Sequence, residues 1–298
     1  MKRWIKWTGG VVGGLVVVVV GLVITGQQMA QAKRTRQVDV AVQGIPYATE
    51  AADLERGRYL FASRGCVDCH GANGGGREFV NDGKGTRIAG PNITSGGTTA
   101  AYTPQDWVRV IRHGVKPSGQ PVFIMPSEDY NQWVDADVAA VVGYVRSLPP
   151  LPGDGRVMDL PLPALVLYGF GMIPDAAQRI DHSKPPAAAV AAGVTPQHGA
   201  YVANMCIGCH GTGLSGGKIA GGPPDWPAAA NLTPGEGSVM PSYPDAQTFV
   251  AMLRSGKRPD GSVIKVMPFG SLREMNDTDA QAIYAYLKTV PPKPNGQH

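Results

Sequence analysis

Cysteine is scarce in this sequence, because the chain has 298 residues and four cysteines, all of them in two short motifs. None is left for structural disulfides, so the sequence does not describe a small disulfide-stabilised scaffold. Glycine and proline are abundant instead, with 40 and 26 residues. This composition is typical of loop-rich folds with short regular elements, and the length leaves room for two or three small domains.

Acidic residues are absent from the first 36 positions, which hold six of the 27 basic residues. Once these six are set apart, the remainder carries 21 basic against 23 acidic residues, a net charge of −2. A body without excess positive charge offers no electrostatic footprint for nucleic acid. We therefore expect no nucleic-acid partner and assign the basicity of the chain to its N-terminal end.

Uncharged residues fill positions 7–26, directly after a basic N-terminal end. This segment of about 20 residues has the length that crosses a bilayer and exceeds a usual signal-peptide core. We predict an uncleaved transmembrane signal-anchor here, followed by a polar linker over residues 27–50. The alternative is a removed signal peptide, because Ala30-Gln31-Ala32 has the form of a cleavage site. Basic residues flank both sides equally, so they do not set the orientation.

An internal duplication organises the rest of the chain. The corresponding segments are Cys66-Val67-Asp68-Cys69-His70 with Cys206-Ile207-Gly208-Cys209-His210, Pro91-Asn92-Ile93-Thr94 with Ala230-Asn231-Leu232-Thr233, and Met125-Pro126 with Met267-Pro268. We predict two copies of one domain, over residues 51–150 and 196–292. An interdomain linker over residues 151–195 joins them, and its apolar run at 161–174 is too short to span a bilayer. We expect that run to pack against a domain or a partner.

Helix signals recur inside each copy. Thr103 and Pro104 predict a helix start, with Asp106 completing a capping box, and Gly114 predicts its end. The last helix of the first copy is expected from about Asp135, and its counterpart in the second copy starts 142 positions later. Both end at a Pro-Pro pair, which cannot continue a helix. The pattern indicates helices separated by long loops.

The motif Cys-x-x-Cys-His has the spacing that attaches a haem covalently. Two thiols three positions apart on one helical turn can add to the two vinyl groups of a porphyrin, and the next residue then places its imidazole on the iron. We predict two covalently bound haem c groups. The attachment and proximal residues are Cys66, Cys69 and His70 in the first copy, and Cys206, Cys209 and His210 in the second.

A redox dithiol or half a zinc site can also contain Cys-x-x-Cys. In this chain each pair is followed at once by histidine, and the whole motif occurs twice inside a duplicated domain. A zinc site would need a second pair of ligands, which neither copy supplies. These observations favour haem attachment over both alternatives.

Each copy resembles a class I cytochrome c domain over nearly its whole length, in its haem motif, its Pro-Asn loop, its loop methionine and its last amphipathic helix. The resemblance implies an all-α, loop-rich fold with three main helices per domain, two domains in tandem after the N-terminal transmembrane helix. It also implies that the first and last helices of each domain cross where a glycine meets an aromatic residue. The matching residues are Gly57 with Tyr144 and Gly199 with Tyr286.

The resemblance further implies how each iron is held. The backbone carbonyl of Pro91 would orient the proximal imidazole, and the second copy offers the carbonyl of Ala230 instead. Met125 and Met267 match the family's sixth ligand, since each precedes a proline before the final helix. Met240 competes with Met267, because it also precedes a proline, only 30 residues after the proximal histidine.

Three further histidines leave bis-histidine ligation open, namely His113, His182 and His198. Methionine ligation would raise the haem potential relative to bis-histidine ligation and suit the high-potential end of a respiratory chain. With both axial positions filled, neither iron would have an open site for oxygen or peroxide. We therefore expect an electron carrier and no enzyme, with no small-molecule substrate.

The expected partners are a redox protein that donates electrons and another that accepts them. We expect the chain in the cytoplasmic membrane as a single-pass protein, with its haem domains on the periplasmic side where c-type haem is attached. The whole chain resembles membrane-anchored dihaem cytochromes and, more loosely, the multihaem subunits of periplasmic dehydrogenases. Those subunits usually carry three haem motifs, whereas this chain has two. A haem subunit of a dehydrogenase or oxidase complex is therefore the alternative, with a dihaem peroxidase behind it.

Overall fold

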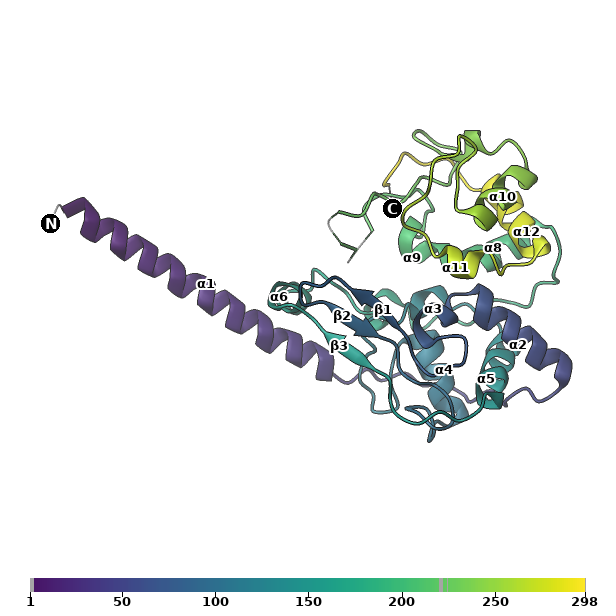
Figure 1. Cartoon of the computed structure of the whole chain (residues 1–298), viewed down its shortest axis with the longest axis horizontal. Helices are drawn as coiled ribbons and strands as arrows, with labels where there is room; N and C mark the ends of the chain where they lie inside the picture. Colours follow the sequence, from purple (N-terminus) through teal and green to yellow (C-terminus); the bar gives the residue numbers. More distant parts are fainter. Residues whose placement is uncertain (1–2, 220–221, 224, 298) are drawn as a thin grey trace.

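The computed structural model describes residues 3–219, 222–223 and 225–297, without the side chains of residues 3, 5 and 6. Lys2, part of the basic N-terminal end, lies outside them. One long helix, α1 (Arg3–Thr35), projects from a body made of two helical units, one above the other in Figure 1. The expected fold class is confirmed: the chain is mostly helical, with two units after a long apolar helix.

The first unit is built on the pairing of its first and last helices. Its elements are α2 (Ala51–Ser63), α3 (Cys66–His70), β1 (Glu78–Asn81), β2 (Arg87–Ala89), α4 (Pro104–His113), the 3₁₀ turn η1 (Ser127–Asp129) and α5 (Asp135–Ser147). The expected capping box of α4 is present, because Asp106 N donates to Thr103 Oγ1 at 3.3 Å and Thr103 N donates to Asp106 Oδ2 at 3.0 Å. Gly114 ends α4 in the left-handed conformation, with φ of 63°.

The second unit repeats this plan, and its described residues form isolated β-bridges but no strand. Its elements are α8 (Pro196–Ala203), η2 (Asn204–Cys206), α9 (Ile207–His210), η3 (Met240–Ser242), α10 (Ala246–Ser255), α11 (Phe269–Leu272) and α12 (Asp277–Leu287). The start of its last helix at Asp277 agrees with the sequence prediction.

The crossing of the first and last helices follows from the absence of a side chain on one residue in each unit. A Cβ placed on Gly57 would lie 2.0 Å from the carbonyl oxygen of Ala140 and 2.8 Å from Tyr144 Cβ. A Cβ placed on Gly199 would lie 1.9 Å from the carbonyl oxygen of Ala282 and 2.7 Å from Tyr286 Cβ. Backbone therefore meets backbone at both crossings, and the expected glycine–tyrosine pairs are confirmed. Each crossing borders a separate apolar core.

The connection between the units is structured. It contains β3 (Val157–Asp159), α6 (Leu162–Gly169) and α7 (Ala176–Arg179). β3 pairs with β2 to complete a small antiparallel sheet in the order β1-β2-β3, which the helical expectation did not include. α6 packs against α1, and α1 itself continues to Thr35, through the first part of the segment predicted as a polar linker.

Candidate functional site: two haem-attachment motifs

The two Cys-x-x-Cys-His motifs form short helical turns that end in the same way. Each turn ends at a glycine with positive φ, 71° at Gly71 and 75° at Gly211, a conformation that L side chains rarely adopt. The chain then folds back, so that the carbonyl oxygens of His70 and His210 accept hydrogen bonds at 2.9 Å from amides six residues further on. These contacts fix the position of both histidines.

Each motif histidine is held by a backbone carbonyl. His70 Nδ1 lies 2.9 Å from the oxygen of Pro91, and His210 Nδ1 lies 2.8 Å from the oxygen of Ala230. A carbonyl can only accept, so Nδ1 carries the proton and Nε2 keeps the lone pair that a metal ion binds. Burial lowers the pKa of both imidazoles, which favours their neutral form. The expected carbonyl contact is confirmed in both copies, and the donor set fits a haem iron.

Burial disfavours the thiolate form of the four motif cysteines. Burial raises the pKa of Cys66 and Cys206 to about 12 and that of Cys69 to about 11. A redox dithiol needs a thiolate near neutral pH, so these surroundings oppose that alternative. Within the described part of the chain, no cluster of three or more His, Cys, Asp or Glu side chains is placed to hold a metal ion, which gives a zinc site no support.

In each unit, the loop whose carbonyl contacts the motif histidine is joined to the segment after the last helix by an asparagine–threonine pair. Asn92 Oδ1 accepts from Thr94 N and Oγ1, while Asn92 Nδ2 donates to the Leu151 carbonyl at 2.6 Å. Asn231, Thr233 and Lys293 make the equivalent bonds. Both asparagines are fully buried. The repeat of Asn-x-Thr in the sequence marked these positions, but nothing local in the sequence identified their partners.

The two Met-Pro turns before the last helices have matching backbone angles at their prolines. Pro126 has φ and ψ of −80° and 63°, and Pro268 has −78° and 62°. The carbonyls of Met125 and Met267 each accept an amide hydrogen bond at 2.9 Å from two residues further on. Met240 lies elsewhere, at the start of η3, and is 4 % exposed in the core of the second unit. The choice of Met125 and Met267 as sixth ligands stays a prediction.

The three histidines that left bis-histidine ligation open are engaged with protein groups. His113 Nδ1 lies 3.0 Å from His182 Nδ1, and His182 Nε2 contacts the Ala177 carbonyl at 2.9 Å. His198 is buried, with its Nε2 2.7 Å from Asp279 Oδ1. Both ring nitrogens of His182 are committed to protein partners, which disfavours this histidine as a haem ligand.

The units meet through a reciprocal pair of tyrosine–aspartate hydrogen bonds that sequence reasoning missed. Tyr59 of the first unit donates to Asp279 Oδ2 of the second at 2.6 Å. Tyr201 of the second unit donates to Asp137 Oδ2 of the first, also at 2.6 Å. Tyr201 follows Tyr59 by 142 positions, and Asp279 follows Asp137 by the same offset. The two units therefore contribute the same surface of the repeat to their interface. Arg64, buried, adds an ion pair to Asp279.

Each haem motif also touches the other unit. Ser271 Oγ of the second unit donates to Asp68 Oδ2 in the first motif at 2.7 Å. Gly208 N in the second motif donates to Asp129 Oδ1 of the first unit at 3.1 Å. Burial raises the pKa of Asp129 to about 8. The signal in the sequence was that Asp129 and Ser271 occupy equivalent positions, four residues after the Met-Pro methionines. The helical turns α3 and α9 therefore both lie at the interface between the units.

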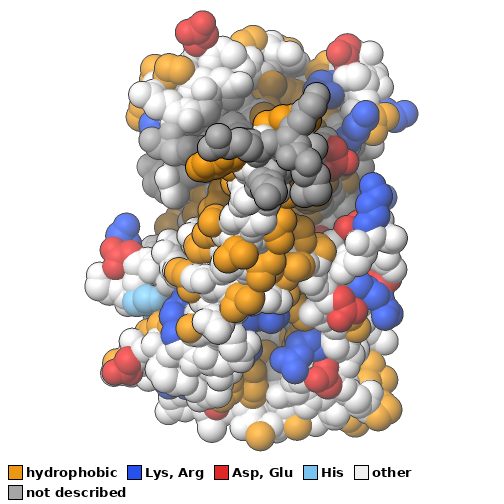
Figure 2. Space-filling model, turned by 90° about the vertical axis from the view of Figure 1, so that its left-hand side faces the viewer, with side chains coloured by type: hydrophobic (Ala, Val, Ile, Leu, Met, Phe, Trp, Pro, Cys, Tyr) orange, Lys and Arg blue, Asp and Glu red, His pale blue; other side chains and the backbone are white. Residues whose placement is uncertain are grey.

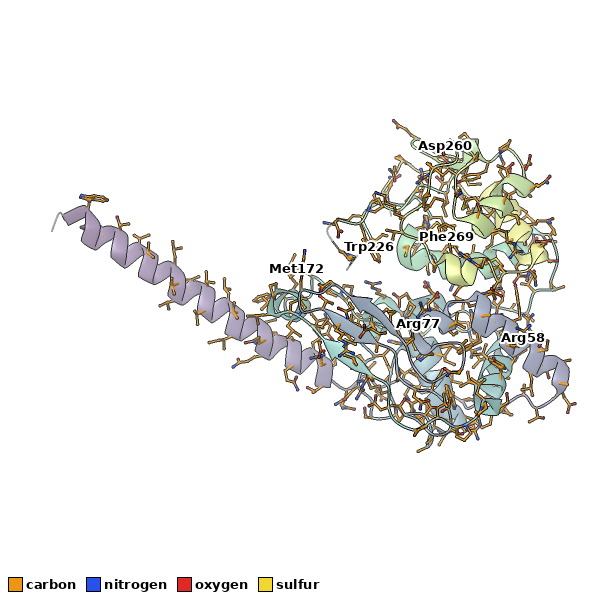
Figure 3. All side chains as sticks on the ribbon, viewed as in Figure 1. Arg58, Arg77, Met172, Trp226, Asp260 and Phe269 are labelled. Carbon is orange, nitrogen blue, oxygen red and sulfur yellow. The ribbon has the colours of Figure 1, made fainter. Side chains whose placement is uncertain are left out.

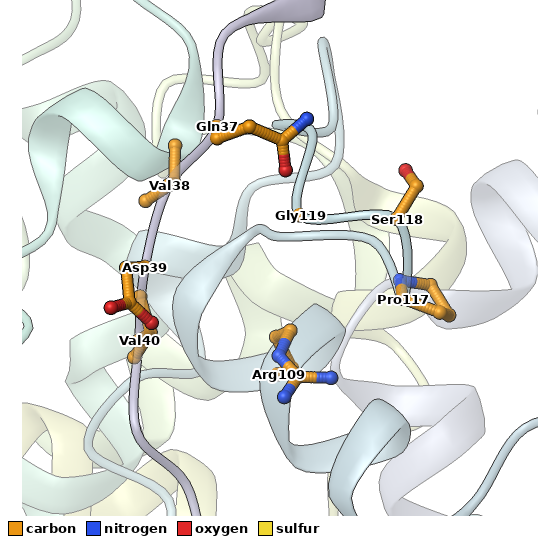
Figure 4. A pocket seen from close by; sticks show the side chains of 8 residues that line it. All are labelled: Gln37, Val38, Asp39, Val40, Arg109, Pro117, Ser118 and Gly119. Carbon is orange, nitrogen blue, oxygen red and sulfur yellow. The ribbon is translucent and has the colours of Figure 1, made fainter.

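A surface pocket lies apart from the motifs. It is lined by the segment after α1 and by the turn after α4, with Gln37, Asp39, Arg109 and Gly119 among its residues (Figure 4). It contains none of the residues expected to bind haem.

Comparison with known proteins gives a consistent assignment for both units. The family described as "Cytochrome C oxidase, cbb3-type, subunit III" matches residues 52–145 and again 195–287. The chain is 28 % identical over 284 residues to a protein named "Diheme cytochrome c-type" from Cereibacter sphaeroides, which covers 82 % of this chain and 88 % of that protein.

Two longer relatives are named as cytochrome subunits. The fructose dehydrogenase cytochrome subunit of Gluconobacter japonicus is 26 % identical over 275 residues, covering 83 % of this chain and 54 % of that protein. The cytochrome c subunit of alcohol dehydrogenase (quinone) from Gluconobacter oxydans is 25 % identical over 293 residues, covering 86 % of this chain and 59 % of that protein. The chain thus spans little more than half the length of these two relatives.

Proposed function

The chain belongs to the cbb3-type cytochrome c oxidase subunit III family and carries two of its cytochrome c domains in tandem, and we propose that it relays electrons outside the cytoplasm through two haem c groups. Bound haem supplies one-electron exchange at its iron. The observation that carries the proposal is the matched pair of motifs, each with its histidine held by a backbone carbonyl at 2.8–2.9 Å.

The protein groups in each motif have separate tasks in this proposal. Cys66 and Cys69, and their counterparts Cys206 and Cys209, would hold the porphyrin through thioether bonds. His70 and His210 would bind iron through Nε2, since Nδ1 is committed to the carbonyl in each unit. The carbonyl contact keeps the tautomer and the ring orientation fixed, which makes the imidazole a stronger donor.

Met125 and Met267 would complete the two iron sites. Their turns have matching backbone angles and the same position before the last helix, as one duplicated role requires. Met240 has no equivalent in the first unit and sits inside an apolar core. Filled axial positions would exclude peroxide, which favours an electron carrier over a dihaem peroxidase.

The contacts of α3 and α9 with the opposite unit support transfer between the two haem groups within one chain. Asp68 and Ser271 join the first motif to the second unit, and Gly208 and Asp129 join the second motif to the first unit. Hydrogen bonds that hold both motifs at the interface between the units would keep the distance between the two haem groups constant.

Membrane anchoring through α1 is supported by how its C-terminal end packs. Residues 7–35 form the one helix of the described chain that is long and apolar enough to cross a membrane. Ala30, inside the alternative cleavage site, is 3 % exposed and lies within a continuous helix. Cleavage after Ala32 would remove the part of α1 against which α6 packs. We therefore favour the uncleaved anchor, with the haem units on the periplasmic side.

Haem counting on the purified full chain tests the proposal. The pyridine haemochrome method should give two haem c per chain, and one in either Cys66→Ala or Cys206→Ala. Native protein should bind no carbon monoxide when reduced. Rapid carbon monoxide binding at one haem would favour the peroxidase, and a haem count of zero would contradict the proposal itself.

Membership of a larger complex is a second candidate, because two relatives are named as subunits of dehydrogenases. Purification from membranes solubilised in mild detergent separates the two possibilities. A dehydrogenase or oxidase that co-elutes in constant ratio would show a fixed subunit, whereas the chain alone would indicate an independent carrier.

A further inference from the structure

The connection between the units crosses α1 at two glycines. A Cβ on Gly169 of α6 would lie 2.0 Å from the Gly26 carbonyl oxygen, and a Cβ on Gly26 would lie 2.8 Å from Val166 Cγ1. The two helix backbones therefore touch, as small residues allow at close helix crossings. This crossing determines where along α1 the apolar segment 161–174 lies.

Charged and polar contacts lock the crossing on its C-terminal side. Lys33 Nζ donates to the carbonyls of Tyr168 and Ile173, at 3.2 and 2.8 Å. The guanidinium of Arg36 donates two hydrogen bonds to Asp175, both at 2.7 Å. α6 is thus held between a glycine contact and an ion pair, and it cannot slide along α1 without breaking one of them.

The outer face of this segment is apolar and exposed. Met172 is 68 % exposed, and Leu162, Leu167 and Phe170 are about two-fifths exposed. No charged residue occurs between Asp159 and Asp175. In Figure 3, Met172 lies at α6, beside α1. Figure 2, which views the molecule from the side on which α1 projects, shows hydrophobic side chains gathered in a central band.

The position of the crossing indicates what covers this face. A bilayer core of about 30 Å takes about 20 helical residues at 1.5 Å each. Counted from Trp7, the first residue after Lys6, that length ends at Gly26, where α6 crosses. The exposed face of α6 consequently lies at the level where the hydrocarbon core of the membrane would end. Lys33 and Arg36 follow that level along the chain, where the headgroups would lie.

We propose that residues 161–174 form a second membrane contact, which inserts the apolar face of α6 and its following loop into the bilayer interface beside α1. The inference rests on the proposed anchoring by α1. Two contacts of different kind, a span and an interfacial segment, would hold the haem units at one orientation to the membrane. A single flexible tether would leave them free to rotate.

Cysteine accessibility on the full chain tests this, with one chain per nanodisc of phosphatidylcholine so that no second copy can cover the face. Three variants carry an introduced thiol: Met172→Cys, Val17→Cys within the span, and Asp260→Cys. Asp260 lies at the top of the second unit in Figure 3, far from α1. The native thiols are consumed in haem attachment under the proposed function. Modification by a membrane-impermeant maleimide is followed by mass spectrometry.

We expect Met172→Cys to react about tenfold more slowly than Asp260→Cys, because a thiol in an apolar environment forms little thiolate. Met172 is well exposed on the protein alone, so protection has to come from lipid. Fast reaction at Met172→Cys together with slow reaction at Val17→Cys would overturn the interfacial contact and leave the anchor intact. Fast reaction at Val17→Cys would instead refute the anchor, and reaction of the unsubstituted chain would refute haem attachment.

Discussion

Replacing Asp279 with alanine tests the idea that one buried carboxylate holds the two units together. Asp279 accepts hydrogen bonds from Tyr59 at 2.6 Å and is 2.7 Å from His198 Nε2, and it pairs with Arg64. The Arg64 and Asp279 side chains are 5 % and 7 % exposed. The substitution would leave the Arg64 guanidinium buried without a compensating charge.

The expected cost follows from that burial. Removing one partner of a buried ion pair costs about 3–5 kcal/mol, most of it from the charge left behind. The repeat supplies a matched control in Asp137→Ala, at the same helical position in α5. There the ion-pair partner is Arg56, whose side chain is 44 % exposed and can turn to water. The lost hydrogen bond of Tyr201 accounts for the remaining cost, about 1–2 kcal/mol.

Thermal unfolding of the haem-loaded full chain in detergent measures the difference. For units of this total size each kcal/mol shifts Tm by about 2–4 °C. The Tm of Asp279→Ala should therefore be lower than the Tm of Asp137→Ala by roughly 5–10 °C. Replacing the ion pair as a whole, with Arg64→Leu and Asp279→Leu together, should recover most of the loss. Equal losses for the two aspartate variants would refute the reasoning from burial.

Three further predictions concern ligation, packing and pH. Met267→Ala should lower one haem potential by about 0.1–0.2 V, a fraction of the range that axial ligands control, and open that haem to carbon monoxide. Met240→Ala should do neither. If redox titration shows the lowered potential in Met240→Ala and not in Met267→Ala, Met240 is the ligand. Gly57→Ala should destabilise the chain by about 3 kcal/mol or more, because its Cβ would lie 2.0 Å from a carbonyl of α5, whereas Gly193→Ala, with 3.9 Å of space, should leave Tm nearly unchanged. Burial acts to raise the pKa of Asp279, but its cationic and hydrogen-bonding partners prevail and lower that pKa below the ordinary 3.8. The unfolded chain therefore binds more protons than the folded chain below about pH 4, and stability is lost as the pH falls through that range. The Tm of Asp279→Asn should consequently drop less between pH 5 and pH 3 than the Tm of the unsubstituted chain.

Much of each candidate haem site was predictable because its chemistry is local. The motif places two thiols and an imidazole within five residues, and the helix caps at Thr103 and Gly114 act over three or four. The glycine–tyrosine crossings and the carbonyl partners of His70 and His210 were expected from the resemblance, and the structure confirms them. The sheet was not expected, because β3 lies in a segment interpreted as linker and pairs with a strand about 70 residues earlier.

The sequence by itself therefore determined the pair of motifs, the duplication and the apolar N-terminal segment, because each depends only on neighbouring residues or on a repeated pattern. Only the tertiary structure decided how the copies face each other and how α1 meets the body. Tyr59 and Asp279 are 220 positions apart, and Lys33 and Ile173 are 140 apart. No local pattern encodes such pairs, because their free energy arises only when folding brings the two segments together and removes both from water.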